Sequence, residues 1–293
     1  MCGLAHVLES PNSSISIGVS FKPVTSSRGQ ARAKKSLGQH FLSDPRTAER
    51  ILGAADLSQD DLVVEIGPGR GVLTSKLVER AKRVVAVELD ADLLARLPER
   101  LGNPDNLTCV EADARDVDLA AIIAPETRFK VVANLPYYAA NPIVRRLLES
   151  HPKPEVLVVM VQQEVAKNMA AQPGDMGILS VATQFYAKTK MVCSVPPRSF
   201  KPPPKVTSAV LRLDVMPEPA AQVASEEGFF HVVRAGFAAP RKQLRNSLSQ
   251  GLGIATPEGG RILESAGIDA TRRPQTLNIQ EWAEVYRAWK EES

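Results

Sequence analysis

The chain has 293 residues, 44% of them hydrophobic, which suits one large domain or two ordinary ones with a full core. The formal net charge is +3, and the three cysteines are far apart, which argues against a disulfide framework and a zinc cluster and predicts a reducing, cytoplasmic setting. No apolar run approaches the roughly 18 residues that a membrane-spanning helix needs, and no metal site is expected.

Positive charge is concentrated in three stretches that contain no acidic residue, residues 10–43, 176–213 and 229–256. These stretches either converge on one polyanion-binding face or form three separate solvated patches, and the sequence leaves both interpretations open. The candidate RNA-binding cations in the second and third stretches are Arg198, Lys201, Lys205, Arg241, Lys242 and Arg245.

Residues 1–32 are rich in serine and lack periodicity, so we predict a disordered extension. They lack the basic start and long apolar run of a secretory signal, and a transit peptide is only weakly indicated. Asp44 and Pro45 then predict the N-cap and first residue of a helix that runs to about Leu57. The residues just before it, including His40 and Leu42, are predicted to form a polar and aromatic loop.

The stretch from Leu62 to Leu73 predicts a buried strand, a tight glycine turn and a helix. In α/β folds this arrangement lets the backbone approach a nucleotide-like ligand. The turn contains Gly67 and Gly69 in a G-x-G-x-G spacing, whereas a dinucleotide site prefers G-x-G-x-x-G. Glu65 precedes it, and a carboxylate there suits a cofactor with an amino-acid ammonium group better than a pyrophosphate. The pattern therefore favours S-adenosylmethionine.

The next two predicted strands are 83–88 and 107–111. The first ends in Glu88, and Asp113 closely follows the second. Glu88 lies about 20 residues after the glycines, where it can accept both hydroxyls of a ribose. It could instead cap the next helix, but Asp90 is available for that role. Asp113 can reach an adenine amino group, although an aspartate in this position is also a common turn former.

The fourth predicted strand, 129–133, ends in the sequence Asn-Leu-Pro-Tyr-Tyr at the mouth of the fold. Asn134 offers an amide carbonyl, Leu135 and Pro136 offer backbone carbonyls, and Tyr137 offers a ring on which a base can stack. The alternative is a simple Asn-Pro-type turn with two half-buried tyrosines. A helix is predicted to begin near residues 141–142.

A fifth strand is predicted at 155–161, helices at 162–171 and 178–186, and an antiparallel strand pair at 191–195 and 206–213. The loop inside this pair contains five prolines and Phe200. It is predicted to be stiff and basic, with Phe200 exposed for base stacking. Alternatively, the loop is a strand connector whose Phe200 fills the core.

A linker at residues 217–220 predicts a domain boundary, followed by helices at about 226–238, 240–251, 257–266 and 278–290. The second of these would place Arg241, Lys242 and Arg245 near one face, where they could bind phosphates. The last begins with a predicted capping box between Asn278 and Glu281.

Five stretches together resemble the bacterial 16S ribosomal RNA adenine dimethyltransferase family. They are 37–42 (LGQHFL), 65–71 (EIGPGRG), 134–138 (NLPYY), 200–206 (FKPPPKV) and 237–246 (FAAPRKQLRN). The resemblance covers about residues 33–290. Two features depart from the family pattern, Ala112 where many members have glycine, and the amino-terminal extension.

The resemblance implies an α/β fold, the Rossmann-like class I methyltransferase sheet, mostly parallel with an antiparallel last strand pair, and a small all-α C-terminal domain. The expected domains are 1–32 (extension), 33–215 (methyltransferase) and 216–293 (RNA binding). Its implied activity is dimethylation of the N6 amines of two adjacent adenosines near the 3′ end of 16S rRNA, in the small ribosomal subunit precursor. Independently of the resemblance, a monomer is the default expectation. The cofactor contacts that it implies are His40, Leu42, Gly67, Glu88, Asp113 and Asn134.

Two other classes of function remain open at this point. One is a non-catalytic relative that acts in ribosome assembly or as a transcription factor, against which the intact residues 134–137 argue. The other is a nicotinamide oxidoreductase, against which the glycine spacing and Glu65 argue. Methyltransferases of 23S rRNA that confer resistance share the catalytic motif, and only the resemblance at residues 237–246 favours 16S rRNA.

Overall fold

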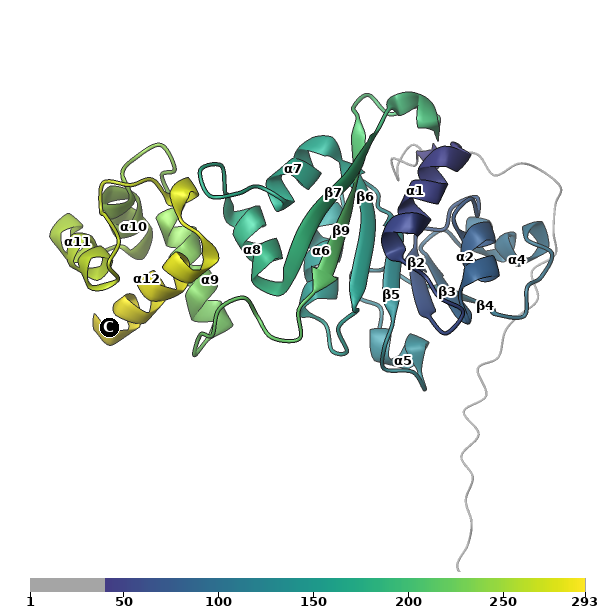
Figure 1. Cartoon of the computed structure of the whole chain (residues 1–293), viewed down its shortest axis with the longest axis horizontal. Coiled ribbons are helices and arrows are strands. Elements are labelled where there is room, and N and C mark those ends of the chain that lie inside the picture. The colour runs from purple at the N-terminus through teal and green to yellow at the C-terminus, as the bar shows by residue number, and fades with distance from the viewer. Residues whose placement is uncertain (1–39, 293) are drawn as a thin grey trace, which may run out of the picture. The chain divides into compact units, whose positions relative to one another are not determined.

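The computed structural model describes residues 40–292 (Figure 1). The predicted disordered extension at 1–32 and the first half of the motif at residues 37–42 lie outside the described residues, so neither expectation is tested here.

A seven-stranded sheet has the strand order β4-β3-β2-β5-β6-β9-β7 (Figure 1). The neighbouring pairs from β4 to β6 are parallel, whereas β9 runs antiparallel to both β6 and β7. This confirms the predicted class I methyltransferase sheet with its antiparallel last pair. The strands are β2 Leu62–Ile66, β3 Arg83–Glu88, β4 Leu107–Glu111, β5 Lys130–Asn134, β6 Val156–Gln162, β7 Ala187–Val195 and β9 Ser208–Val215.

Helices cover both faces of the sheet, so its central strands are buried on both sides. On one face Val63 and Val132 pack with residues of α1 and α2, and on the other Val64 and Val131 pack with residues of α6. Alternate residues of a strand point to opposite faces, so the continuous apolar runs serve both. The helices here are α1 Pro45–Ala55, α2 Thr74–Arg80, α3 Ala91–Ala95, α4 Leu97–Arg100, α5 Leu119–Ile123, α6 Ala140–Glu149, α7 Gln163–Met169 and α8 Ile178–Tyr186.

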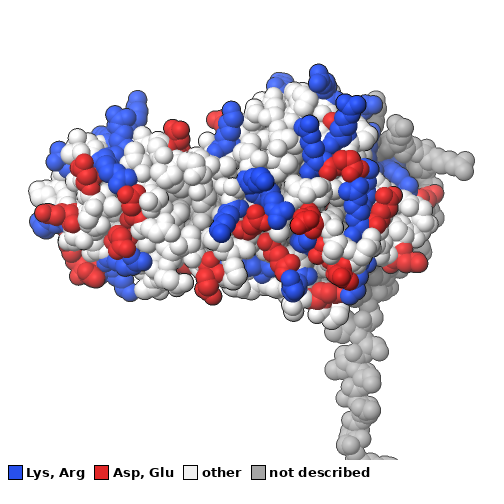
Figure 2. Space-filling view, in the orientation of Figure 1, with Lys and Arg blue, Asp and Glu red and all other residues white. Residues whose placement is uncertain are grey.

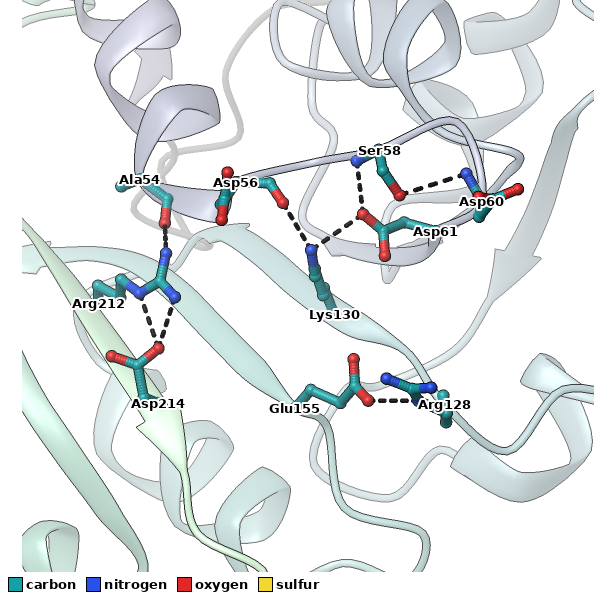
Figure 3. Close-up of polar contacts among 10 residues, drawn as sticks. All are labelled: Ala54, Asp56, Ser58, Asp60, Asp61, Arg128, Lys130, Glu155, Arg212 and Asp214. Atoms are coloured by element: carbon teal, nitrogen blue, oxygen red, sulfur yellow. Dashed lines mark hydrogen bonds and ion pairs between the residues drawn. The ribbon is translucent and has the colours of Figure 1, made fainter.

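Helix α1 is held at both ends. At its start the Asp44 carboxylate accepts a hydrogen bond from the Arg46 amide, which confirms the predicted N-cap. At its end two cations from the sheet bind backbone carbonyls that the helix leaves unpaired (Figure 3). Lys130 Nζ lies 2.6 Å from the Asp56 carbonyl oxygen, and Arg212 donates to the carbonyl of Ala54. The carboxyl end of α1 is therefore tied to β5 and β9.

The segment before α1 is a short strand, so the predicted loop there was wrong. Phe41–Leu42 form β1, which pairs antiparallel with β8, Phe200–Lys201. The pairing continues outward, because the Ser43 amide donates to the Ser199 carbonyl at 2.8 Å. A two-residue strand has no periodicity to detect, and its partner lies far away in the chain.

The remaining helices follow the last strand and form an all-helical region. They are α9 Glu226–Gly236, α10 Leu244–Leu252, α11 Thr256–Ser265 and α12 Ile279–Glu292. Phe229 of α9 stacks on Phe185 of α8 with ring centroids 4.7 Å apart. The Asn278–Glu281 capping box is confirmed by its two reciprocal hydrogen bonds. The bounds of the three domains stay a prediction.

The basic segment before α10 differs from its prediction. Helix α10 begins at Leu244, so only Arg245 of the three predicted cations is helical. Arg241 and Lys242 lie in a turn in which the Lys242 amide donates to the Ala239 carbonyl. Pro240 lies within this turn, which delays the start of the helix. All three cationic side chains are nevertheless exposed.

Candidate active site

A hollow of about 520 Å³ opens beside the carboxyl ends of β2, β3 and β5, where ligands bind in open α/β sheets. It brings together residues from the glycine turn, three strand ends and the β1–β8 pair. Its lining residues are His40, Phe41, Gly67, Gly69, Glu88, Asn134, Leu135, Pro136, Tyr137 and Phe200.

The glycine turn is tight for two reasons. Gly67, Gly69 and Gly71 all have positive φ values, of 70°, 55° and 81°, which L-residues with side chains rarely adopt. A Cβ at Gly69 would also lie 3.0 Å from Cδ1 of Phe41, and one at Gly71 would lie 2.8 Å from Cδ1 of Leu97. The backbone of the turn therefore lies directly against β1.

Glu88 faces the glycine turn, and its predicted contact with ribose hydroxyls stays a prediction. Its Oε2 accepts a hydrogen bond from the Gly69 amide at 3.3 Å, and its Oε1 accepts from the amides of Leu89 and Asp90. Burial raises the pKa of Glu88, although these amides favour its charged form. Asp90 caps α3, so the capping alternative does not explain Glu88.

Glu65 is buried beside the same turn and is incompletely paired. Its side chain is 1% exposed, and its Oε2 has no hydrogen-bond partner among the described residues. Burial raises the pKa of Glu65 to about 8, and the nearby charge of Glu88 adds to the shift. A second, smaller hollow, lined also by Leu42 and Gly67, reaches this carboxyl group. A cationic group of a ligand would satisfy the free oxygen.

We expect Glu65→Gln to make the ligand-free protein more stable than wild type at high pH. The pKa of Glu65 is raised from 4.5 to about 8 on folding, so its contribution to stability is present below pH 4.5 and lost as the pH rises towards 8. The difference in the free energy of unfolding between Glu65→Gln and wild type should grow by up to about 1.4 kcal/mol per pH unit across that window. Urea unfolding of both proteins at pH 5, 7 and 9 measures it, and a constant difference would contradict the assignment.

Asn134 is oriented by a backbone group outside the sheet. Its Nδ2 donates to the carbonyl oxygen of His40 at 3.2 Å. Because a carbonyl only accepts, this contact fixes which end of the amide is nitrogen and leaves Oδ1 for another donor. The Pro136 carbonyl already accepts from the Ala139 amide, so of the two predicted backbone acceptors the structure favours Leu135.

Tyr137 is held at two points. Its ring stacks on the His40 imidazole with centroids 5.9 Å apart, and its hydroxyl lies 2.7 Å from Oγ of Ser208 on β9. His40 is held in turn, because its Nδ1 donates to the Pro202 carbonyl. Sequence reasoning missed Ser208 and the role of the His40 carbonyl, since nothing local to either residue indicates these partners.

Phe200 lines the hollow but is only 2% exposed, so the prediction of an exposed ring was wrong. Pairing of β8 with β1 turns its side chain into the core cluster that contains Val195 and Val210. This agrees with the alternative interpretation, in which Phe200 fills the core. A stacking role would use only the part of the ring that borders the hollow.

Asp113 is not among the residues that line the hollow. Its carboxylate binds the Arg115 guanidinium, with both oxygens 3.0 Å from Nε, and this lowers the pKa of Asp113. A contact with an adenine amino group therefore stays a prediction, and it requires this pair to open or to share its oxygens.

The predicted RNA-binding cations Arg198, Lys201 and Lys205 are all exposed. Lys201 is part of β8, which borders the hollow, and the other two lie close to it in the chain. On the face drawn in Figure 2, Lys and Arg side chains occur along the upper margin of the sheet-containing part, and many acidic side chains lie lower. The other three cations lie on the α9–α10 turn and α10. Convergence of the basic stretches on one face stays a prediction.

Three further observations apply to residues 40–292. They contain no group of three or more His, Cys, Asp or Glu side chains arranged to hold a metal. None of their helices combines the length and apolarity that crossing a bilayer requires. Cys109 and Cys193 are both free thiols.

Known proteins are similar to this chain in both sequence and fold. Residues 30–285 match the family described as ribosomal RNA adenine dimethylase. The chain is 45% identical to a ribosomal RNA small subunit methyltransferase A from Dehalococcoides mccartyi, over 86% of each chain. It is also 45% identical to the protein of the same name from Pelotomaculum thermopropionicum, over 86% of this chain and 90% of that one.

Two solved structures have a similar fold. The 23S rRNA methyltransferase ErmE has a TM-score of 0.69 and 30% identity, over 85% of this chain and 99% of that one. A dimethyladenosine transferase from Plasmodium falciparum has a TM-score of 0.74 and 24% identity, over 86% of this chain and 98% of that one. The second comparison supports the fold alone.

Proposed function

The chain belongs to the ribosomal RNA adenine dimethylase family, and we propose that it dimethylates the N6 amines of two adjacent adenosines near the 3′ end of 16S rRNA. The methyl donor is S-adenosylmethionine, as the family implies. The observation that carries the proposal is the Asn134 amide, which the His40 carbonyl orients beside the hollow with its oxygen left for a donor.

The residues around the hollow suit S-adenosylmethionine. The Glu88 carboxylate suits ribose hydroxyls, and the buried, unpartnered Oε2 of Glu65 suits the ammonium of the methionine part. The positive-φ glycine turn allows close approach of a ligand to the backbone. When bound, S-adenosylmethionine supplies an electrophilic methyl group on a sulfonium.

Asn134 and Leu135 activate the target amine by accepting its hydrogens. The N6 amine of adenine is a poor nucleophile because its lone pair is delocalised into the ring. Two acceptors, Oδ1 of Asn134 and the Leu135 carbonyl, favour a pyramidal nitrogen whose lone pair is available for attack. Positioning and electrostatics then provide most of the rate. No general base is needed, because the alkylated amine is acidic enough to lose its proton to water.

Tyr137 provides the stacking surface for the extruded adenine, which must leave the RNA stack to be reached. Its ring contacts the His40 ring and also lines the hollow, where a base would enter. The proposed catalytic set is Asn134, Leu135 and Tyr137, with Pro136 shaping the turn beside them and Phe200 contributing only the part of its ring that borders the hollow. After the first transfer one amine hydrogen remains, so the same acceptors must serve a monomethylated amine that has turned.

The choice of small-subunit RNA is supported by the relatives. Those at 45% identity are named for the small subunit, whereas the 23S rRNA enzyme ErmE is 30% identical. A non-catalytic relative would have no need of the oriented Asn134 amide. Action in the cytoplasm as a monomer, on the small-subunit precursor, completes the proposal.

Mass spectrometry tests this function directly. Purified protein is incubated with isotope-labelled S-adenosylmethionine and either small-subunit or large-subunit particles that lack the modification. We expect four labelled methyl groups in 16S rRNA, two on each of two adjacent adenosines. Label confined to 23S rRNA would support the resistance-type alternative, and absence of label with no cofactor binding would support the non-catalytic one.

The predicted RNA-binding role of the three cations at and just before the start of α10 has its own test. We expect replacement of Arg241, Lys242 and Arg245 by alanine to lower the slope of log affinity against log salt by about 2 to 3, because each released counterion contributes roughly 0.7 to 0.9. Filter binding of the RNA between 50 and 300 mM salt measures the slope.

The matched control replaces three other exposed cations, Lys82, Arg100 and Arg128, which changes the net charge equally. Its slope should change little. Equal slopes for both triple variants would mean that the RNA does not contact the α9–α10 turn.

A further inference from the structure

The pair formed by Tyr137 and Ser208 joins the candidate stacking ring to β9, the strand that runs antiparallel between β6 and β7. The phenol oxygen lies 2.7 Å from Oγ of Ser208, and the two residues are 71 positions apart. Ser208 is the first residue of β9 and is completely buried. Its backbone is placed between two strands, because its Cα pairs with Gln162 of β6 and Val195 of β7.

We propose that Ser208 is a positioning residue for methyl transfer, which acts by fixing the Tyr137 ring for stacking with the target base. This inference rests on the proposed function and goes beyond it, because Ser208 does not line the hollow. It acts only through the tyrosine hydroxyl.

The geometry explains why one hydrogen bond matters. A tyrosine side chain is placed by two torsions, and contact with His40 restrains the ring face but leaves it free to slide. A bond at the far end of the ring, to a residue fixed between two strands, removes that freedom. The base then meets a ring already in place, and an error of about 1 Å at the reacting nitrogen would cost rate.

A double-mutant cycle with Ser208→Ala and Tyr137→Phe tests the proposal, since both changes remove the hydrogen bond and keep the ring. Each single variant should lower the single-turnover methylation rate about tenfold, near the value of one hydrogen bond. The double variant should be no slower than either single one. A double variant slowed about 100-fold, or a Ser208→Ala enzyme with the wild-type rate, would overturn the proposal.

A binding readout separates positioning from a general loss of structure. With 2-aminopurine in place of the target adenosine, both single variants should show weaker quenching on RNA binding, while their affinity for the cofactor stays within about twofold of wild type. The matched control is Ser150→Ala, which removes another buried serine hydroxyl bonded to the Leu147 carbonyl. It should lower the melting temperature without changing the rate.

The outcomes also distinguish this inference from the proposed function. If the wild-type protein transfers no methyl group, the function itself fails. If the wild-type protein is active but Ser150→Ala slows transfer as much as Ser208→Ala does, only the positioning role fails.

Discussion

Asn134→Ala is expected to lower the methyl-transfer rate about 100- to 1,000-fold, the loss typical of removing one preorganised group that meets developing charge. The change removes Oδ1, the acceptor that the His40 contact leaves available for the target amine. Binding of RNA and of the cofactor should change far less, because Asn134 is one small contact among many. Single-turnover transfer of labelled methyl groups measures the rate, and calorimetry measures cofactor affinity.

Asn106→Ala is the matched control for this substitution. Asn106 donates two hydrogen bonds to the carbonyls of Val78 and Ala81, away from the hollow. Its loss should reduce stability but leave the rate per folded molecule intact. Substantial activity in Asn134→Ala would show that Leu135 and the stacked ring alone can activate the amine, and that the role assigned to Asn134 is wrong.

Glu88→Ala is expected to weaken cofactor binding at least about 100-fold. The carboxylate would provide two charge-assisted hydrogen bonds to the ribose, each contributing roughly 1.5 to 3 kcal/mol. The change also frees the amides of Gly69, Leu89 and Asp90, which now bind the carboxylate. Calorimetric titration with S-adenosylhomocysteine measures the affinity without turnover.

Glu111→Ala supplies the comparison for Glu88→Ala. Glu111 ends the neighbouring strand and pairs with Glu88 in the sheet register, but its side chain is exposed. Its removal takes away the same charge one strand further from the glycine turn, so affinity should be nearly unchanged. Equal effects of the two substitutions would point to general electrostatics, and unchanged binding in Glu88→Ala would remove Glu88 from the ribose site.

Much of the sheet could be predicted because the parallel strands β2, β3, β5 and β6 each contain a buried apolar run bounded by turn residues. Since parallel strands end at the same edge, the positions of Glu65, Glu88 and Asn134 along the chain were enough to expect them together. The G-x-G-x-G spacing then argued for the sulfonium cofactor over a dinucleotide. These inferences need only local pattern and a general rule of topology.

The other side of the hollow depends on pairings that leave no local pattern. The two-residue strands β1 and β8 are too short to show alternation, so Phe200 was expected to be exposed and is buried. The bonds from Asn134 to His40 and from Tyr137 to Ser208 join residues 94 and 71 positions apart. Propensity also placed Arg241 and Lys242 in a helix that the turn at Pro240 delays.

The two sides of the hollow come from distant parts of the chain, and this has a consequence for the synthesis of the protein. His40 and its partner Pro202 are 162 residues apart, and the residues between His40 and β8, including Glu88 and Asn134, leave the ribosome before β8 does. At a typical 5 to 20 residues per second, roughly 8 to 30 s pass between the two. A nascent chain therefore carries the glycine turn and the Asn134 amide, which we propose to be catalytic, well before it carries β8, so we expect the site to be complete only late in synthesis.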